Sequence, residues 1–169
     1  MYDIGSYVMY GNQGVCQILE LRREDFSGEW KDYYILSPLD DAKMTIYVPM
    51  DAEALLARMR PLLSREEVAI LIREGCAAEP MEWIHDARGR SELFRQILQS
   101  GNQHRLMVML RTIYQRREEQ MALGKKLYSA DETAFEKAEK LLHGEIAAVL
   151  NIQPDQVQDY IQSQLSAEG

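Results

Sequence analysis

The chain has 169 residues, of which 46% are hydrophobic and 27% are charged, so it can bury one ordinary core or two small ones. No stretch approaches the ~18 uninterrupted apolar residues of a membrane helix, and the first residues lack the pattern of a signal peptide. The two cysteines match neither a zinc site nor a disulfide framework. We therefore expect a cytoplasmic, monomeric protein with no membrane partner.

The charge is unevenly distributed along the chain. The net charge of −8 argues against nucleic-acid binding over the whole surface. Residues 84–117 nevertheless hold seven arginines against two acidic residues, a local charge of +5 that leaves −13 for the remainder. This run is either a solvated helix face or a local site for an anionic partner. Its arginines are Arg88, Arg90, Arg95, Arg105, Arg111, Arg116 and Arg117.

The first fifty residues have the pattern of an antiparallel β structure. Runs rich in β-branched and aromatic residues alternate with turn clusters such as residues 11–14. In the last run, Ile46 and Val48 share one face and Tyr47 lies on the other. Pro49 cannot donate to a ladder, so it marks a strand end or an edge. A small antiparallel barrel or a strongly bent sheet is expected, with strands at 6–10, 15–21, 30–39 and 44–50.

From residue 51 onward the periodicity becomes helical. The S-x-x-E spacing that begins at Ser64 predicts a capped helix start, with Gly75 as the C-terminal stop. Ser129 begins a second S-x-x-E spacing, and Asn102 is expected to cap another helix. Pro154 suits the first turn of a short last helix. The helices are predicted at about 52–59, 65–74, 82–100, 103–121, 133–150 and 154–165.

The change of period predicts an α+β protein of two domains, a β domain at 1–62 and an all-α domain at 63–169. No βαβ alternation, phosphate-binding loop or G-x-S-x-G elbow is present in the sequence. The histidines at 85, 104 and 143 are isolated, and none pairs with another at i+4 to form a metal helix. We therefore expect no enzymatic activity, no cofactor and no metal site.

The last strand of the β domain, in "KMTIYV", is the best candidate for a binding edge. Unpaired backbone groups at a sheet edge can accept a strand from a partner protein. Ile46 is expected to pack inward and Tyr47 to point outward. Tyr47 either contacts a partner or only covers a neighbouring strand, and Arg22 and Arg23 are more commonly solvated than functional.

Trp83 is one of only two tryptophans and lies at the start of the cationic run. An indole is large and apolar, and it is usually buried. Two interpretations remain open. The ring could pack on the first turn of its own helix as a hydrophobic staple. Alternatively, it could insert between bases as an apolar wedge while nearby cations hold the phosphates.

Five segments in succession resemble the CarD/CdnL family of bacterial transcription regulators. The opening "YDIGSYVMYGNQGVCQILEL" is similar to that family's "VGD-x-VVYP-x-HGVG-x-I" pattern. The segments "YYIL" and "MTIYVPMDAEALLARMRPLLS" are similar to its "YYVL" and "VPxxN…GLRPL" regions. Two helical segments, beginning "MEWIHDARGR" and "YSADETAFEKAEKLL", continue the resemblance in order, so it covers roughly residues 2–150. The N-terminal part alone also resembles the polymerase-interacting domain of transcription-repair coupling factors.

The resemblance implies a Tudor-like or SH3-like β domain that binds the RNA polymerase β subunit. By strand position, the polymerase contacts fall on Arg23, Ile46, Tyr47 and Val48. It also implies that the helical domain meets promoter DNA at the minor groove in a sequence-tolerant way. The family's wedge tryptophan, which slows collapse of the open promoter complex, falls on Trp83.

The DNA-contacting residues that we expect around the wedge are His85, Arg88, Arg90 and Arg105. The sequence departs from the family here, because His85 and Asp86 stand where two arginines are usual, and Glu82 replaces an asparagine. Tyr47 likewise stands where a basic residue is common. A polymerase-binding or other protein-interaction module with little DNA binding is the alternative function.

Overall fold

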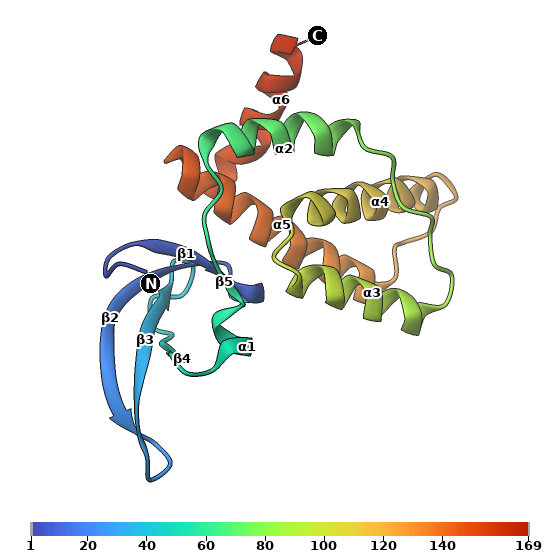
Figure 1. Cartoon of the computed structure of the whole chain (residues 1–169). Coiled ribbons are helices and arrows are strands. Elements are labelled where there is room, and N and C mark those ends of the chain that lie inside the picture. Colours follow the sequence, from blue (N-terminus) through green and yellow to red (C-terminus); the bar gives the residue numbers. More distant parts are fainter. Residues whose placement is uncertain (1, 169) are drawn as a thin grey trace. The chain divides into compact units, whose positions relative to one another are not determined.

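The computed structural model describes residues 2–168, which divide into two compact units, Met1–Leu62 and Leu63–Gly169. The first unit holds a five-stranded antiparallel sheet and the second holds α-helices (Figure 1). The α+β fold class predicted from the change of period is therefore confirmed.

The sheet of the N-terminal unit has the strand order β4-β3-β2-β1-β5. Among the described strands, β4 and β5 are not paired with each other, so the hydrogen-bonded ladder stays open and β4 forms one of its edges. The strand β5 was not predicted, because Met59 lies at the end of the helix expected at 52–59 and the two residues after it indicate only a helix break. The elements are β1 (Tyr7–Tyr10), β2 (Val15–Asp25), β3 (Trp30–Pro38), β4 (Ile46–Pro49), α1 (Glu53–Leu56) and β5 (Met59–Pro61).

One face of this sheet carries the core of the unit. A β-bulge between Ile18 and Glu20 shifts the register of β2 against β3 and bends the strand. Cys16 lies fully buried in this core, and desolvation raises the pKa of its thiol to about 12, so it is a protonated, apolar core residue. The core side chains are Val8, Tyr10, Cys16, Ile18, Tyr34, Leu36, Val48 and Met59.

The hairpin of β2 and β3 is longer than the sequence predicts. Pairing continues to Asp25 and Trp30, beyond the part of the sheet that packs on the core (Figure 1). Apolar side chains near this end, including Phe26 and Trp30, are exposed by 60% and 62%. Residues 22–25 are all charged, so the sequence indicates a strand end at residue 21. The strand continues to Asp25 because neither face of the hairpin is buried there.

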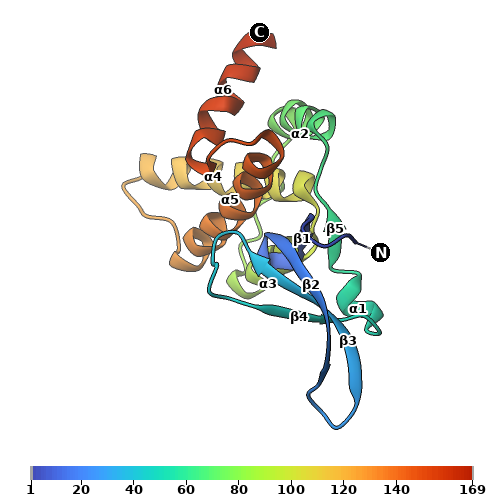
Figure 2. The ribbon, with the colours of Figure 1, turned by 90° about the vertical axis from the view of Figure 1, so that its left-hand side faces the viewer.

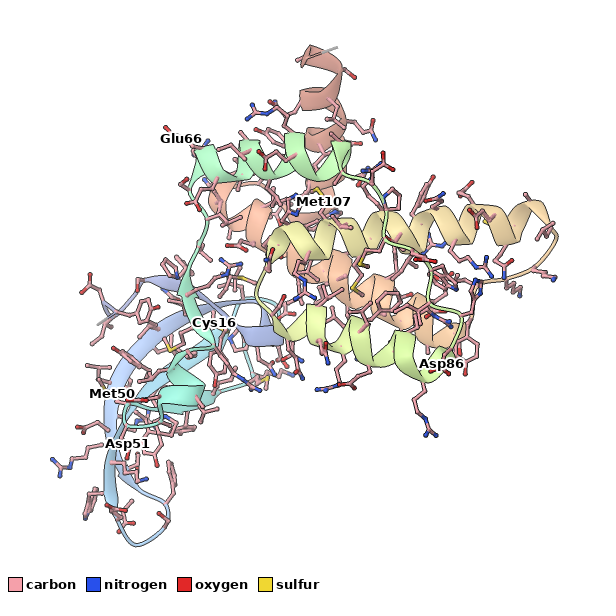
Figure 3. All side chains as sticks on the ribbon, turned by 45° about the vertical axis from the view of Figure 1, so that its right-hand side comes forward. Cys16, Met50, Asp51, Glu66, Asp86 and Met107 are labelled. Atoms are coloured by element: carbon pink, nitrogen blue, oxygen red, sulfur yellow. The ribbon has the colours of Figure 1, made fainter. Side chains whose placement is uncertain are left out.

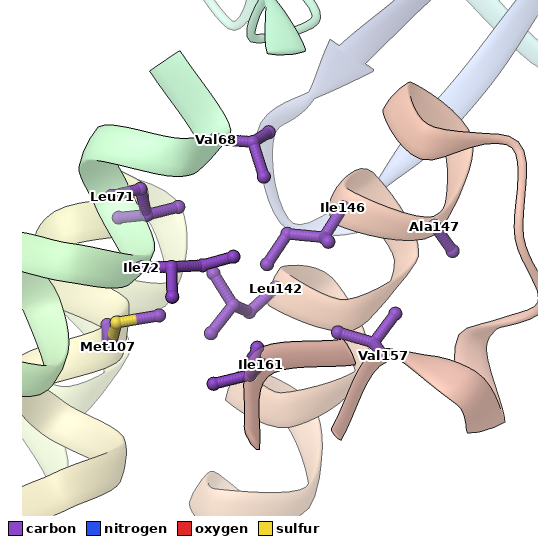
Figure 4. Close-up of a cluster of buried hydrophobic side chains, with 9 residues drawn as sticks. All are labelled: Val68, Leu71, Ile72, Met107, Leu142, Ile146, Ala147, Val157 and Ile161. Carbon is purple, nitrogen blue, oxygen red and sulfur yellow. The ribbon is translucent and has the colours of Figure 1, made fainter. Parts of the chain in front are cut away.

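In the C-terminal unit, α5 is the helix around which the others pack. It contacts α2, α3, α4 and α6 (Figures 1 and 2). The core between α2, α4, α5 and α6 is built from aliphatic side chains at helical spacing, such as Val68 with Ile72 and Leu142 with Ile146 (Figure 4). The elements are α2 (Arg65–Ala77), α3 (Ala87–Gln99), α4 (Gln103–Ala122), α5 (Ser129–Leu150), η2 (Pro154–Gln156) and α6 (Val157–Glu168).

Two of the predicted helix caps are confirmed and one is wrong. The Ser64 and Glu67 side chains form a reciprocal capping box at α2, and the Asn102 side chain accepts the Arg105 N–H at α4. Ser129, in contrast, is the first residue of α5, and its predecessor Tyr128 makes no side-chain cap. The S-x-x-E spacing is therefore coincidental at that position.

Gly75 was predicted to end α2. It lies buried inside this helix instead. The space that a side chain would need there is filled by Met107 of α4, whose side chain points toward α2 (Figures 3 and 4). Gly75 therefore permits the close approach of two helices, and the helix continues to Ala77.

The helix predicted at 82–100 begins five residues later, at Ala87. Asp86 is its N-cap, with its carboxylate accepting the Gly89 N–H at 3.0 Å (Figure 3). Trp83 consequently lies in the loop that precedes α3, outside the helix itself. Asp86, which looked unfavourable for a phosphate contact, serves to start this helix.

Candidate functional site

A cluster of aromatic side chains lies at the β4 edge of the sheet. The rings of Phe26, Tyr33 and Tyr47 meet edge to face, with centroids 5.3 to 6.1 Å apart. Arg22 donates to the Tyr47 hydroxyl at 3.1 Å, and its guanidinium carbon lies 5.9 Å from the centre of the Tyr47 ring. We call these four residues the aromatic edge.

The aromatic edge adjoins a strand that can still accept a partner. Among the described strands β4 pairs only with β3, so its outer side presents unpaired backbone groups. Tyr47 is 38% exposed and Phe26 is 60% exposed, which leaves apolar surface beside these groups. An edge of this kind suits main-chain pairing with a protein strand, with Tyr47 adding a side-chain contact.

The side chains of the predicted polymerase-contacting residues point in different directions. Ile46 packs against the sheet core and Val48 is fully buried in it. These two residues therefore face inward, as expected for Ile46, and can offer a partner only their backbone. The polymerase contacts predicted at Ile46 and Val48 stay predictions, and at Val48 such a contact would involve the backbone. Tyr47 alone presents its ring.

Arg23 does not lie beside Tyr47. Arg23 pairs across the ladder with Asp32, whereas Arg22 pairs with Tyr33, which packs on Tyr47. Because neighbouring residues of a strand point to opposite faces, Arg23 and Tyr47 are on different sides of the sheet. Arg22 is thus the cation of the aromatic edge, and the β-bulge upstream explains why the face could not be predicted by simple alternation.

The indole of Trp83 is half-buried between cations. The guanidinium carbons of Arg90 and Arg116 lie 4.7 and 5.4 Å from the ring centroid. The ring also meets Phe94 of α3 edge to face, at a centroid distance of 6.2 Å. Trp83 therefore rests on its own helix, as a staple would, while the ring remains partly accessible in a cationic setting.

The loop that carries Trp83 is attached to α4. The Met81 N–H donates to the Thr112 hydroxyl at 2.9 Å, and the Arg111 guanidinium donates to the carbonyl oxygen of Ala78. These bonds fix the stretch before Trp83. Thr112 and Arg111 belong to the basic run of the sequence, so part of that run serves to position the loop.

The side chain of Arg90, one of the predicted DNA contacts, is buried. Its side chain is 7% exposed, and it forms a buried ion pair with Asp131 at 2.8 Å. It also donates to the carbonyl oxygen of Ile84 at 2.8 Å. A guanidinium that is buried and already occupied by protein acceptors cannot reach a phosphate. This pairing could not be predicted from the sequence, because Asp131 lies forty-one residues from Arg90.

The other predicted DNA-contacting residues are exposed. His85 lies in the Trp83 loop and Arg88 lies in the first turn of α3. Arg105 is exposed in the first turn of α4. It lies eleven residues from Arg116, or roughly 16 Å along the helix at 1.5 Å per residue, so it is not part of the immediate surroundings of the indole.

Arg116 was overlooked, although the basic run contains it. Its side chain is 28% exposed and pairs with Glu119 at 3.6 Å while also facing Trp83. An exposed ion pair of this kind is weak and can exchange its carboxylate for a phosphate. We call Trp83, His85, Arg88 and Arg116 the indole site.

Two further observations concern residues 2–168. No helix in this part of the chain is long and apolar enough to cross a membrane. Within the same residues, no group of three or more His, Cys, Asp or Glu side chains could hold a metal ion.

The comparisons with known proteins concern the N-terminal unit. The CarD-like/TRCF RID domain matches residues 2–63, which include every strand of the sheet and the aromatic edge. No curated protein matches the chain. The matched domain type suggests an interaction with RNA polymerase. The resemblance seen in the sequence is thus confirmed for the N-terminal unit, and residues 2–63 belong to the CarD-like/TRCF RID domain family.

Proposed function

We propose that the protein is a non-enzymatic transcription regulator that binds the RNA polymerase β subunit with its N-terminal unit and promoter DNA with its helical unit. The polymerase contact is supported by the domain match and by the open β4 edge. Tyr47 and the backbone of β4 make this contact, with Arg22 beside them. We assign the protein to the cytoplasm, in association with the nucleoid.

The DNA contact rests on one observation, the partly accessible indole of Trp83 with the partly exposed guanidinium of Arg116 beside it. An apolar wedge enters a base step that is already unstacked more readily than a stacked one, because unstacking costs a few kcal/mol per step. Arg88 and Arg116 can hold the phosphates on either side. No base is read, so the contact is sequence-tolerant.

Such a contact stabilises the open promoter complex by differential affinity. A ligand shifts an equilibrium only if it binds one state more tightly than the other. The indole site binds the upstream edge of the melted DNA better than closed duplex, and the polymerase contact raises its effective concentration there. The collapse of the bubble is thereby slowed.

The alternative is a protein-interaction module whose helical unit has little affinity for DNA. The net charge of −8 and the withdrawal of Arg90 from the surface favour it, as do Glu82 and Glu119 near the indole. It predicts polymerase binding without any DNA affinity at moderate salt.

Binding of polymerase and DNA should be measured separately with single variants. Tyr47→Ala should weaken capture of the isolated polymerase β lobe, whereas the exposed Tyr114→Ala in the helical unit should not. Trp83→Ala should reduce the affinity for fork-junction DNA, whereas Trp30→Ala should leave it unchanged. Equal fork-junction affinity of the wild type and Trp83→Ala would favour the protein-interaction module.

A further inference from the structure

One guanidinium in the helical unit lies beside two aromatic rings. The guanidinium carbon of Arg90 lies 4.7 Å from the ring centre of Trp83 and 5.9 Å from that of Tyr128. Trp83 belongs to the loop before α3, and Tyr128 immediately precedes α5. Arg90 is 6% exposed, whereas Tyr128 is 58% exposed. The arginine thus supports two accessible rings without being accessible itself.

The plane of this guanidinium is fixed by acceptors on two segments. Its Nε donates to the Asp131 carboxylate at 2.8 Å, and its Nη1 donates to the Ile84 carbonyl at 2.8 Å and the His85 carbonyl at 3.5 Å. Arginine donors lie in one rigid fork, so several fixed acceptors define the orientation of the whole group. The face presented to Trp83 is therefore defined as well.

The same group also holds the backbone that follows Trp83. Ile84 and His85 are the next two residues of the loop, and their carbonyl oxygens are the Arg90 acceptors. One side chain thus controls both the ring and its main chain. Stability alone does not require this arrangement, because apolar residues of similar volume often replace buried ion pairs without loss.

We propose that Arg90 is a positioning residue for the DNA contact of Trp83 and acts without touching the DNA. This inference rests on the proposed function. A ring whose orientation is fixed in the free protein loses less conformational entropy when it inserts, so binding to melted DNA is strengthened. Lysine keeps the charge of Arg90 but lacks its planar face and rigid fork of donors.

The first measurement concerns the ring in the absence of DNA. In a Trp30→Phe chain, Trp83 is the single tryptophan, because the sequence holds only two. Time-resolved fluorescence anisotropy should show an immobile indole in this chain and added nanosecond motion in Arg90→Lys. Arg95→Lys, the same exchange at an exposed position of α3 outside the indole site, should leave the indole immobile. An indole that stays equally immobile in Arg90→Lys would overturn the proposal.

The second measurement compares the affinities for fork-junction DNA and closed duplex. Arg90→Lys should reduce the preference for the fork roughly threefold to tenfold, the cost of ordering one side chain on binding. The salt dependence of binding should not change, since Arg90 contacts no phosphate. Because lysine keeps the charge, a direct phosphate contact is tested with the double variant Arg90→Gln, Asp131→Asn, which removes both charges of the buried pair. A salt slope lowered by about one in this variant would indicate a phosphate contact of Arg90 and overturn the positioning role.

The outcomes separate this inference from the proposed function. If Trp83→Ala does not alter the fork preference, the proposed function fails, and the anisotropy still reports whether Arg90 fixes the ring. If Trp83→Ala abolishes the preference and Arg90→Lys leaves it intact, the proposed function stands and the positioning role is overturned. Circular dichroism shows whether Arg90→Lys is folded. If this variant is unfolded, the Trp30→Phe chain alone decides. A freely moving indole in that chain would overturn the proposal, and an immobile indole would support it.

Discussion

Tyr47 of the aromatic edge and Trp83 of the indole site each lie beside an arginine, and these arginines, Arg22 and Arg90, differ in burial. The Arg22 side chain beside Tyr47 is 40% exposed, whereas the Arg90 side chain beside Trp83 is 7% exposed. Arg22 interacts with Glu20 and Glu24 of its own strand. Arg90 interacts with Asp131 of another helix. The exposed arginine is free to exchange partners with an incoming protein, and the buried one can only organise its own domain.

Removing the carboxylate of the buried pair should have the largest effect. Asp131→Ala leaves an uncompensated guanidinium inside the helical unit, which should lower its free energy of unfolding by about 3–5 kcal/mol. Glu20→Ala removes the corresponding acid from the exposed pair and should cost less than about 1 kcal/mol. Denaturant unfolding measures both. Equal losses would show that burial does not distinguish the two arginines.

Removing the ring beside the exposed arginine should affect binding and leave folding intact. Tyr47→Ala should weaken binding to the polymerase β lobe by about 2 kcal/mol, or roughly thirtyfold, as for an aromatic residue central to an interface. Surface plasmon resonance with the immobilised lobe tests this. Arg22→Ala should cost less than Tyr47→Ala. The reverse order would make the cation the main determinant of the contact.

Arg88, an exposed cation in the first turn of α3, should affect the salt dependence of DNA binding. Arg88→Ala should reduce the slope of log affinity against log salt by about one, because one phosphate contact is lost. Arg95→Ala, on the same helix, should leave the slope unchanged because Arg95 lies outside the indole site and is held by Glu92 through two donors, Nε and Nη2. Titrations at several salt concentrations provide the test. Equal slopes for the wild type and Arg88→Ala would remove Arg88 from the indole site.

A smaller difference between the two units is expected in their response to pH. Burial lowers the pKa of His143 below its usual value of 6.5, while residues 1–62 contain no histidine. The unfolded chain therefore takes up the His143 proton at a higher pH than the folded helical unit. The contribution of neutral His143 to the free energy of unfolding is present above about pH 6.5. It is lost as the pH falls through the pKa that His143 has in the folded unit.

Unfolding of the helical unit should thus become easier between pH 7 and pH 5.5, and His143→Gln should reduce this dependence. Trp83 emission in the Trp30→Phe chain reports the unfolding of this unit. An identical pH dependence in the wild type and His143→Gln would show that burial of His143 has no influence on stability.

The fold class was predictable because hydrophobic periodicity changes once, near residue 51, and because helix starts such as Ser64 carry their own capping signals. The less predictable features depend on contacts between distant segments. Gly75 looks like a helix stop until Met107 is seen against it. The side of the sheet on which Arg23 lies could not be predicted, because the bulge in β2 breaks the alternation of side chains.

The candidate sites were predictable to a similar degree. Tyr47 and Trp83 could be singled out from the sequence, since each is a large ring near cations. The distinction between Arg90 and Arg116 could not, because both belong to one basic run and only Asp131, far along the chain, decides which of them is buried.

The central claim is that Trp83 stabilises melted promoter DNA while the N-terminal unit holds the polymerase. It is tested most directly by the lifetime of the open promoter complex, measured by challenge with a competitor in the presence of saturating protein. Wild-type protein should prolong this lifetime. The prolongation with Trp83→Ala should be roughly tenfold smaller, a factor within the ~1–3 kcal/mol of one aromatic–base contact. Equal lifetimes with the wild type and Trp83→Ala, at equal polymerase occupancy, would contradict it.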